Sequence, residues 1–206
     1  MEFWLVRHGR TAANVAGRFQ GRQDIPLNEE GRFEAALLAR RLEGAAEFTL
    51  FLSSDLQRAW ETALIISRAI NLSPLREPLL RERSWGFAEG LRRCEIAAAY
   101  PGLLCPVSGR LKALRCGGEG VRRLLARTGA LRQKLRRHHG SPRRFLLVSH
   151  GGLINAFISG ALGLSGRQRW PYAPAPASLS ILSHDPLRQR SRLLLFDDTS
   201  HLNIKS

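Results

Sequence analysis

Residues 3–9 are Phe3-Trp4-Leu5-Val6-Arg7-His8-Gly9, an apolar run that stops at an arginine, a histidine and a glycine. A short apolar run bounded in this way predicts a buried strand that ends in a functional turn. The same pattern returns at 145–152, where an apolar run ending at Ser149 is followed by His150-Gly151-Gly152. We therefore predict two buried strands, each with a histidine at its carboxyl end.

A third buried strand is predicted at 48–52, and it is followed by Ser53-Ser54-Asp55. Because Asp is a favoured helix N-cap, we expect Asp55 to begin a helix that runs from Leu56 to about Ile70. The residues of this helix that we expect to be buried are Ala59, Ala63 and Ile66.

Two more helices follow from capping and periodicity. Asn28 is a good N-cap, and Glu29 and Glu30 complement the dipole of the helix it begins. We expect that helix to bury Phe33, Leu37, Leu38 and Leu42. Residues 119–137 place apolar or small side chains on one helical face, namely Val121, Leu124, Leu125, Thr128, Leu131 and Leu135.

The order of these elements predicts the fold class. Strands that alternate with helices indicate an α/β protein with a mostly parallel central sheet and helices on both faces, in three layers. The last two strands are expected at 178–182 and 192–196, while 10–27 and 101–117 are expected to be largely irregular. We find no internal repeat or linker, so we expect residues 1–206 to form a single domain.

The chain has 206 residues and a formal net charge of +15, but the charge has no clear pattern. Only three of its 32 basic residues are lysines, and the arginines are scattered in pairs along the chain. A positive field attracts anionic substrates and permits non-specific nucleic-acid binding. Because no recognised nucleic-acid-reading module accompanies the charge, we expect no specific nucleic-acid partner.

The sequence gives little indication of a membrane, secretion or a structural metal. No window holds the roughly 18 consecutive apolar residues of a membrane helix, and Arg7 interrupts the first apolar run. We therefore expect a cytoplasmic protein without a membrane partner. Cys94, Cys105 and Cys116 form no CxxC pair and have no histidine at metal-ligand spacing, so we expect free thiols.

Four cationic or imidazole side chains should meet at one edge of the sheet. Ligands of open parallel sheets bind beyond the carboxyl ends of the strands. Arg7, His8 and His150 follow two of these strands, and Arg58 lies one turn into the helix after the third. A phosphate dianion fits such a pocket, because guanidinium groups match its oxygens.

At these residues the chain resembles the histidine phosphatase superfamily, also called the phosphoglycerate mutase-like family. The resemblance begins with Leu5-Val6-Arg7-His8-Gly9-Arg10-Thr11 and Asn14 and spans nearly the whole chain in the expected order. The later matching segments are Gly17 to Gly21, Asp24 to Leu27, Gly31, Ser53 to Ala59, Thr62-Ala63, Leu80-Arg81-Glu82, Gly86 to Gly90, Gly117 to Glu119, Ser149 to Gly152 and Asp198 to Leu202.

The resemblance implies a metal-independent phosphatase without a cofactor. His8 would carry the phosphoryl group as phosphohistidine, and Arg7, Arg58 and His150 would hold the phosphoryl oxygens. Glu82 would protonate the leaving oxygen and later activate water. Glu89 lies close to Glu82 in the sequence and is the alternative acid.

Further contacts to phosphate or substrate are expected from Thr11, Asn14, Gln20, Gly21 and Gly151. Gly151 would begin a helix whose N-terminal amides favour an anion, whereas Thr11 could equally stabilise a local turn. The expected partner is a small phosphorylated metabolite, with α-ribazole phosphate, phosphoglycerate and sugar phosphates all open. A homodimer is left open as well.

Some positions depart from the family pattern near the expected acid. Arg83-Ser84-Trp85 follow Glu82 where apolar and acidic residues are usual, Ala88 replaces an aromatic residue, and Gly120 replaces a helix-capping serine. These departures keep open a catalytically weak phospholigand-binding protein. The chain lacks the Arg-His-Tyr-Gly segment of the mutases, so we favour a phosphatase over phosphoglycerate mutase-type phosphoryl transfer.

Overall fold

A six-stranded sheet with the order β3-β2-β4-β1-β5-β6 forms the centre of the computed structural model. The model describes residues 1–104, 111–138, 143–164, 172 and 174–203. The strands are β1 (Glu2–Arg7), β2 (Leu50–Ser53), β3 (Leu75–Arg76), β4 (Arg144–Ser149), β5 (Leu179–Asp185) and β6 (Arg190–Asp198). The first four in chain order are mutually parallel, whereas β5 and β6 are antiparallel additions beside β1. The expected mostly parallel sheet is confirmed.

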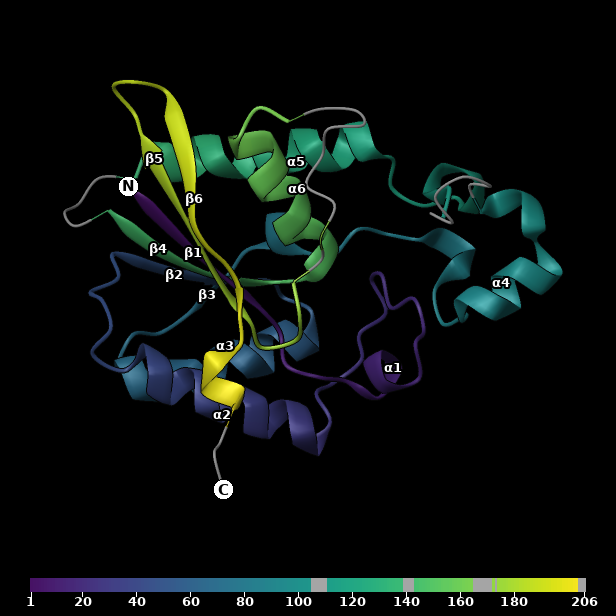
Figure 1. The fold of residues 1–206 in the computed structure, drawn as a ribbon, viewed down its shortest axis with the longest axis horizontal. Helices are drawn as coiled ribbons and strands as arrows, with labels where there is room; N and C mark the ends of the chain where they lie inside the picture. The colour runs from purple at the N-terminus through teal and green to yellow at the C-terminus, as the bar shows by residue number, and fades with distance from the viewer. Residues whose placement is uncertain (105–110, 139–142, 165–171, 173, 204–206) are drawn as a thin grey trace.

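Helices cover both faces of this sheet, as the α/β interpretation predicted (Figure 1). One face carries α2 (Glu29–Leu42) and α3 (Gln57–Ile70), and the other carries α5 (Val121–Arg136) and α6 (Gly151–Ala161). Alternate residues of β1 and β4 point to opposite faces, so Leu5 and Leu147 pack with α5 and α6, while Val6 and Val148 pack with α2 and α3.

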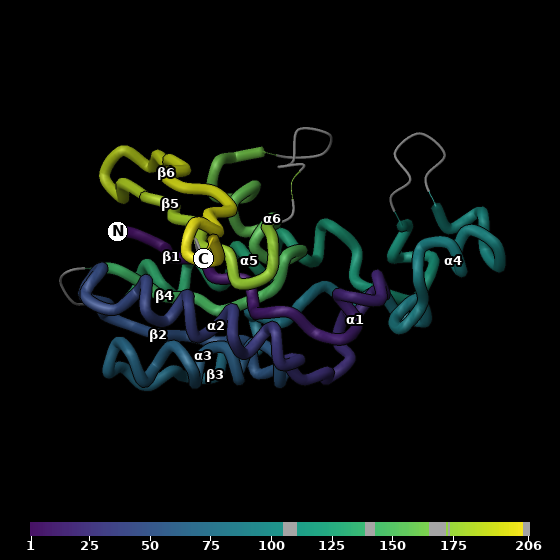
Figure 2. Tube along the Cα trace, turned by 60° about the horizontal axis from the view of Figure 1, so that its bottom comes forward, coloured from purple at the N-terminus to yellow at the C-terminus, as the bar shows by residue number. Residues whose placement is uncertain are grey.

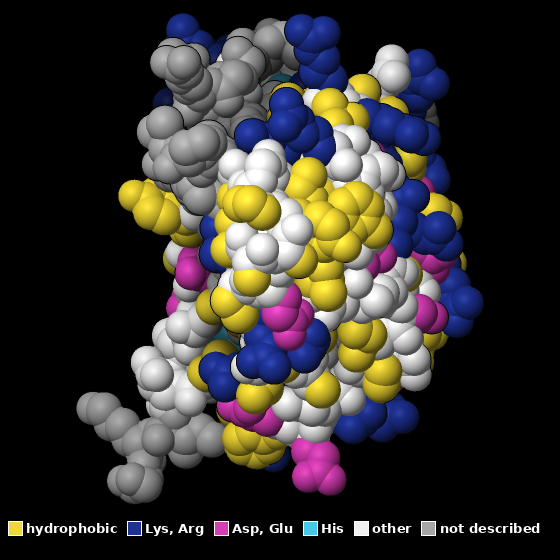
Figure 3. Space-filling view, turned by 90° about the vertical axis from the view of Figure 1, so that its right-hand side faces the viewer, with side chains coloured by type: hydrophobic (Ala, Val, Ile, Leu, Met, Phe, Trp, Pro, Cys, Tyr) yellow, Lys and Arg dark blue, Asp and Glu magenta, His cyan; other side chains and the backbone are white. Residues whose placement is uncertain are grey.

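A smaller lobe lies beyond the carboxyl edge of the sheet. It holds α4 (Arg93–Ala99) and short 3₁₀ turns at 86–88, 101–103 and 113–116, and α1 (Ala12–Val15) lies between it and the sheet (Figure 2). Its own core consists of Ala88, Ile96, Leu111 and Cys116. Hydrophobic side chains lie among Lys and Arg side chains on the surface at this end of the molecule (Figure 3). The lobe lies over the polar residues at the carboxyl ends of the strands.

Two of the local predictions were wrong. Phe33 is 57% exposed, and the buried face of α2 is formed instead by Glu34, Ala35, Leu38 and Leu42. Asp55 does not cap α3, because its carboxylate binds the guanidinium of Arg81 at 2.6 and 2.7 Å. The first amides of α3 are bound by other side chains: Leu56 N donates to Ser54 Oγ (3.3 Å) and Gln57 N to Asp24 Oδ1 (2.6 Å).

Two of the three cysteines lie in the described part of the chain. Cys94 is exposed and Cys116 is buried, and both are free, whereas Cys105 lies outside the described residues. Among the described helices, none combines the length and the apolar character needed to cross a membrane.

Candidate active site

The three predicted polar strand ends meet at the carboxyl edge of the sheet. His8 follows β1, His150 follows β4 and Ser54 follows β2, and these strands are neighbours in the order β2-β4-β1. Backbone bonds extend the ladders past the strand ends, because His8 N donates to Ser149 O and Ser54 N to Val148 O, each at 2.9 Å. The rings of His8 and His150 are consequently only 5.0 Å apart.

His8 is oriented as a nucleophile. Its Nδ1 lies 2.7 Å from the Gly9 carbonyl oxygen, which can only accept, so Nδ1 carries the ring hydrogen. The lone pair is therefore on Nε2, and Arg58 Nε donates to it at 3.2 Å. Burial, with the charges of Arg58 and Arg7, holds the pKa of His8 well below its usual value. The unprotonated ring persists at neutral pH and below.

Arg58 is fixed beside this nitrogen from the first turn of α3. It is completely buried, and its Nη1 and Nη2 donate to the carbonyl oxygens of Gln23 (2.7 Å) and Gly21 (2.8 Å). Burial lowers the pKa of Arg58 to about 10, while the nearby carboxylate of Glu82 acts in the opposite direction. The guanidinium stays charged at neutral pH and points its Nε at the site.

His150 and Arg7 both present polar atoms without a partner among the described residues, namely His150 Nδ1 and Arg7 Nε. His150 Nε2 lies 2.9 Å from Ser54 Oγ, which also accepts from Leu56 N. When the Ser54 hydroxyl donates to Nε2, the hydrogen of a neutral His150 is on Nδ1. Burial and the charge of Arg58 lower the pKa of His150 well below its usual value. Buried orphan donors of this kind mark a place for an anion.

Glu82 lies at the N-terminus of α6, next to His150. Its Oε2 accepts from Gly152 N at 3.0 Å and its Oε1 from Arg83 N at 2.6 Å. The alternative acid, Glu89, is used elsewhere: its Oε1 accepts from Trp85 N (2.9 Å) and Ser84 Oγ (3.2 Å). The geometry favours Glu82, because its charge is the largest influence that opposes the lowering of the pKa of Arg7 and Arg58 by burial, whereas Glu89 has a smaller effect and acts on Arg58.

The remaining predicted contacts form the loop beside His8. Thr11 caps α1 in a reciprocal arrangement, since Asn14 N donates to Thr11 Oγ1 (3.1 Å) and Thr11 N to Asn14 Oδ1 (3.2 Å). Thr11 Oγ1 also lies 2.9 Å from Gln20 Oε1, and the carbonyl of Gly21 binds Arg58. Gly151 begins α6, against the Arg7 guanidinium. Phosphate contact by Thr11, Asn14, Gln20, Gly21 and Gly151 stays a prediction.

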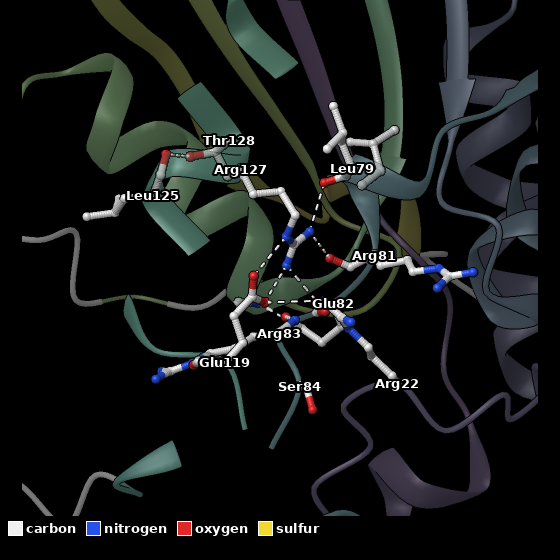
Figure 4. A network of polar contacts seen from close by, with 12 residues as sticks. Arg22, Leu79, Arg81, Glu82, Arg83, Ser84, Glu119, Leu125, Arg127 and Thr128 are labelled. Atoms are coloured by element: carbon white, nitrogen blue, oxygen red, sulfur yellow. Dashed lines mark hydrogen bonds and ion pairs between the residues drawn. The ribbon is translucent and has the colours of Figure 1, made fainter. Parts of the chain in front are cut away.

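A network of polar contacts that the sequence pattern does not indicate holds Glu82 in place (Figure 4). Arg127 of α5 donates to the carbonyls of Leu79 (2.8 Å) and Arg81 (2.6 Å), and it forms a two-point pair with the buried Glu119 carboxylate at 2.7 and 3.0 Å. Arg83 Nε also donates to Glu119 O at 2.7 Å. The backbone on both sides of Glu82 is thereby tied to α5.

Replacing Arg127 with methionine should destabilise the protein and loosen the backbone that positions Glu82. The buried Glu119 carboxylate and two carbonyls would lose their donor, so we expect the free energy of unfolding to fall by about 3–5 kcal/mol. Denaturant unfolding measures this loss. The exposed neighbour Arg123→Met is the control, and the double variant Arg127→Met/Glu119→Gln should regain part of the stability. A loss equal to that of Arg123→Met would contradict the role of the network.

The fold and the site together define the class of protein: an α/β enzyme whose sheet edge presents an unprotonated histidine and two guanidiniums to an anion. A model described as the histidine phosphatase superfamily (branch 1) matches residues 3–197. The chain belongs to this superfamily, so the resemblance stated from its motifs is confirmed.

Individual relatives agree with the family. The chain is 37% identical over 159 residues to the metal-independent phosphoserine phosphatase of Arabidopsis thaliana, a match covering 75% of this chain and 66% of that protein. It is 30% identical over 199 residues to phosphoserine phosphatase 1 of Hydrogenobacter thermophilus, covering 96% and 92%. A solved mycobacterial glucosyl-3-phosphoglycerate phosphatase complexed with VO3 superposes with a TM-score of 0.80 at 31% identity, covering 95% and 98%. The expected phosphoglycerate mutase-like fold is confirmed.

Proposed function

We propose that this chain hydrolyses small phosphomonoesters without a metal ion, through a phosphohistidine on His8. The observation that carries the proposal is the buried His8 ring, whose proton is fixed on Nδ1 and whose unprotonated Nε2 accepts a hydrogen bond from Arg58. Metal-independent phosphatases among the relatives support it. An unprotonated imidazole between fixed cations is what nucleophilic attack on a phosphate dianion requires.

In the first step His8 Nε2 attacks phosphorus, and the bond from phosphorus to the ester oxygen breaks. Arg7, Arg58 and His150 Nδ1 stabilise the charge on the three non-bridging oxygens, which is the electrostatic task of metal ions in many phosphoryl-transfer enzymes. The charge of the bound phosphate dianion favours the carboxylic acid form of Glu82. This form gives its proton to the leaving oxygen, which departs as an alcohol.

In the second step water attacks the phosphohistidine. The Glu82 carboxylate, left deprotonated by the first step, accepts a proton from the attacking water. The bond from phosphorus to Nε2 then breaks and inorganic phosphate forms. Both His8 and Glu82 return to their starting protonation states, so the cycle is balanced without a co-reactant.

The leaving group has a defined place to lie. A cavity of about 820 Å³ is lined by Gly151 and Gly152 and by the side chains of Phe19, Trp85 and Leu124. Because Gly152 N also binds Glu82, this cavity meets the reacting atoms on the side of the acid. Basic residues line it as well, among them Arg122 and Arg123 in the first turn of α5. Small phosphorylated metabolites fit this arrangement.

The test is p-nitrophenyl phosphate hydrolysis with EDTA present. We expect turnover at the same rate in EDTA and in added Mg²⁺, because protein cations do the electrostatic work. A requirement for a divalent metal would contradict the mechanism. Folded protein that releases no phosphate from a panel of phosphomonoesters, yet interconverts phosphoglycerates, would indicate a mutase instead. Phosphate binding without either activity would indicate a binding protein.

A further inference from the structure

A second cavity, of about 520 Å³, lies at the end of the sheet opposite His8. It is enclosed by the C-terminal half of α5, the end of α6 and the β5–β6 hairpin. His184 of β5 lines it, and the amino group of Met1 donates to His184 O at 2.9 Å, so the cavity adjoins the start of β1. His8 follows the other end of that strand, towards α1 (Figure 1). The cavity is thus separate from the catalytic pocket.

Four guanidiniums line this cavity: Arg132 and Arg136 from α5, and Arg190 and Arg192 from β6. Among the described residues that line it none is acidic, and none of these four arginines forms a salt bridge with a described carboxylate. The nearby Asp185 is engaged in the hairpin turn, where it accepts from Leu187 N (2.9 Å). Among the described groups, none supplies a counter-charge to these four guanidiniums.

Arg132 differs from the other buried arginines because no described carboxylate opposes the lowering of its pKa. Its Nη1 donates to the Phe157 carbonyl (3.2 Å), and burial together with the charge of Arg136 lowers its pKa. For Arg7 and Arg58, the charge of Glu82 opposes the lowering of the pKa by burial, and Arg127 forms a salt bridge with Glu119. A partly buried guanidinium opposed by another cation and by no carboxylate is stabilised when an anion binds beside it.

His184 adds a buried polar atom without a partner. The residue is 4% exposed, and its Nδ1 lies 2.9 Å from Ser191 Oγ, which also lines the cavity. Its Nε2 has no hydrogen-bond partner among the described residues. Burial, Arg136, Arg132 and the terminal ammonium lower the pKa of His184, and Asp185 acts against them. A neutral His184 can offer an Nε2 hydrogen to an oxyanion.

We propose that this cavity is a second anion site, which binds a phosphate oxyanion of the oligophosphate class. Guanidinium groups match phosphate oxygens in pairs. A cavity of about 520 Å³ is larger than one phosphate ion needs, so the four guanidiniums suit a chain of two or three linked phosphates better. Such a ligand supplies the counter-charge that the described protein groups do not, and it does so away from His8.

The experiment uses tripolyphosphate as the probe and the His184 ring as the reporter. The full-length His8→Ala variant removes the catalytic nucleophile, and histidine ¹⁵N–¹H spectra, assigned with His184→Gln, follow the ring during titration. We expect saturable shifts of the His184 signals and a rise in the pKa of His184. Substituting the exposed cavity residues in Arg136→Gln/Arg192→Gln should weaken binding about tenfold or more.

The matched control is Arg137→Gln/Arg188→Gln, which removes two exposed charges next to the same elements, at the C-cap of α5 and in the β5–β6 turn, but not from the cavity lining. It should change the affinity much less than the cavity variant. Equal weakening by both pairs would show that tripolyphosphate responds to the general positive charge of the surface and not to this cavity. No shift of the His184 signals at saturating tripolyphosphate would overturn the proposal. A shift with inorganic phosphate alone would support the same site for a single phosphate. A shift of the His184 signals with a DNA duplex but not with tripolyphosphate would contradict the oligophosphate site and indicate a nucleic-acid-binding surface.

Discussion

Substituting His8 with alanine should abolish phosphomonoester hydrolysis, with kcat/KM for p-nitrophenyl phosphate falling by at least about 10⁴-fold. The reason is that, in the proposed mechanism, Nε2 of His8 is the atom that bonds to phosphorus, and the charges of Arg7 and Arg58 stabilise a transition state that cannot form without it. Steady-state release of p-nitrophenol measures the loss. Quenching the wild-type enzyme at high pH during turnover should also trap an acid-labile phosphoenzyme that the variant lacks.

The control for this substitution is His138→Ala, since His138 lies at the far end of α5 and packs its ring against Phe145. It should keep the activity. The pH profile adds an independent check, because burial, Arg58 and Arg7 hold the pKa of His8 below its usual value of about 6.5. Attack requires the unprotonated ring, so kcat/KM should persist as pH falls through 6.5 and decline only below it. Substantial residual turnover in the His8 variant would show that another group is the nucleophile.

The residues that the sequence placed correctly are those fixed by strand ends. His8 and His150 follow strands that are adjacent in the sheet, so the parallel topology alone brings them to one edge, and their rings lie 5.0 Å apart. Arg58 was identified because it lies in the first turn after the third strand. Each of these placements follows from local pattern and a topological rule.

At Asp55 and Phe33, tertiary contacts override the local sequence pattern. Asp55 satisfies the sequence pattern of an N-cap, but Arg81 takes its carboxylate and Asp24, distant in the chain, supplies the oxygen for Gln57 N. In α2 the inward stripe contains Glu34, whose carboxylate binds Arg10 N at 3.0 Å. The buried face of α2 therefore includes a charged side chain and leaves Phe33 outside it, which hydrophobicity alone cannot indicate.

Arg127 could not be identified because its role is defined by a segment about 45 residues away in the sequence. On a helix with many arginines, nothing in the 3.6-residue period distinguishes the one that points inward. Its partner Glu119 lies just before the helix and could be noticed only as part of a family-like segment. The position of Glu82, the proposed acid, therefore depends on contacts that are visible only in three dimensions.

Replacing Glu82 with glutamine should slow the enzyme selectively according to the leaving group. Gln has the same shape and its one oxygen can still accept one of the two backbone hydrogen bonds, from Gly152 N or from Arg83 N, so the fold and the phosphate pocket should persist. It cannot donate a strongly acidic proton, so we expect kcat/KM for alkyl phosphates to fall on the order of 10²–10⁴-fold. p-Nitrophenyl phosphate should lose far less, because p-nitrophenolate departs without protonation. Phosphate release from matched alkyl and aryl esters measures the difference.

The corresponding change Glu89→Gln separates the two candidate acids. The Glu89 carboxylate accepts from Trp85 N and Ser84 Oγ, so its replacement should disturb the loop and affect alkyl and aryl esters alike. If Glu89→Gln shows the selective loss and Glu82→Gln does not, the acid has been assigned to the wrong carboxylate. Equal losses for both ester classes in Glu82→Gln would mean that proton donation is not its task. Only a loss that grows with the basicity of the leaving oxygen assigns proton transfer to Glu82, because neither misfolding nor weaker phosphate binding distinguishes between leaving groups.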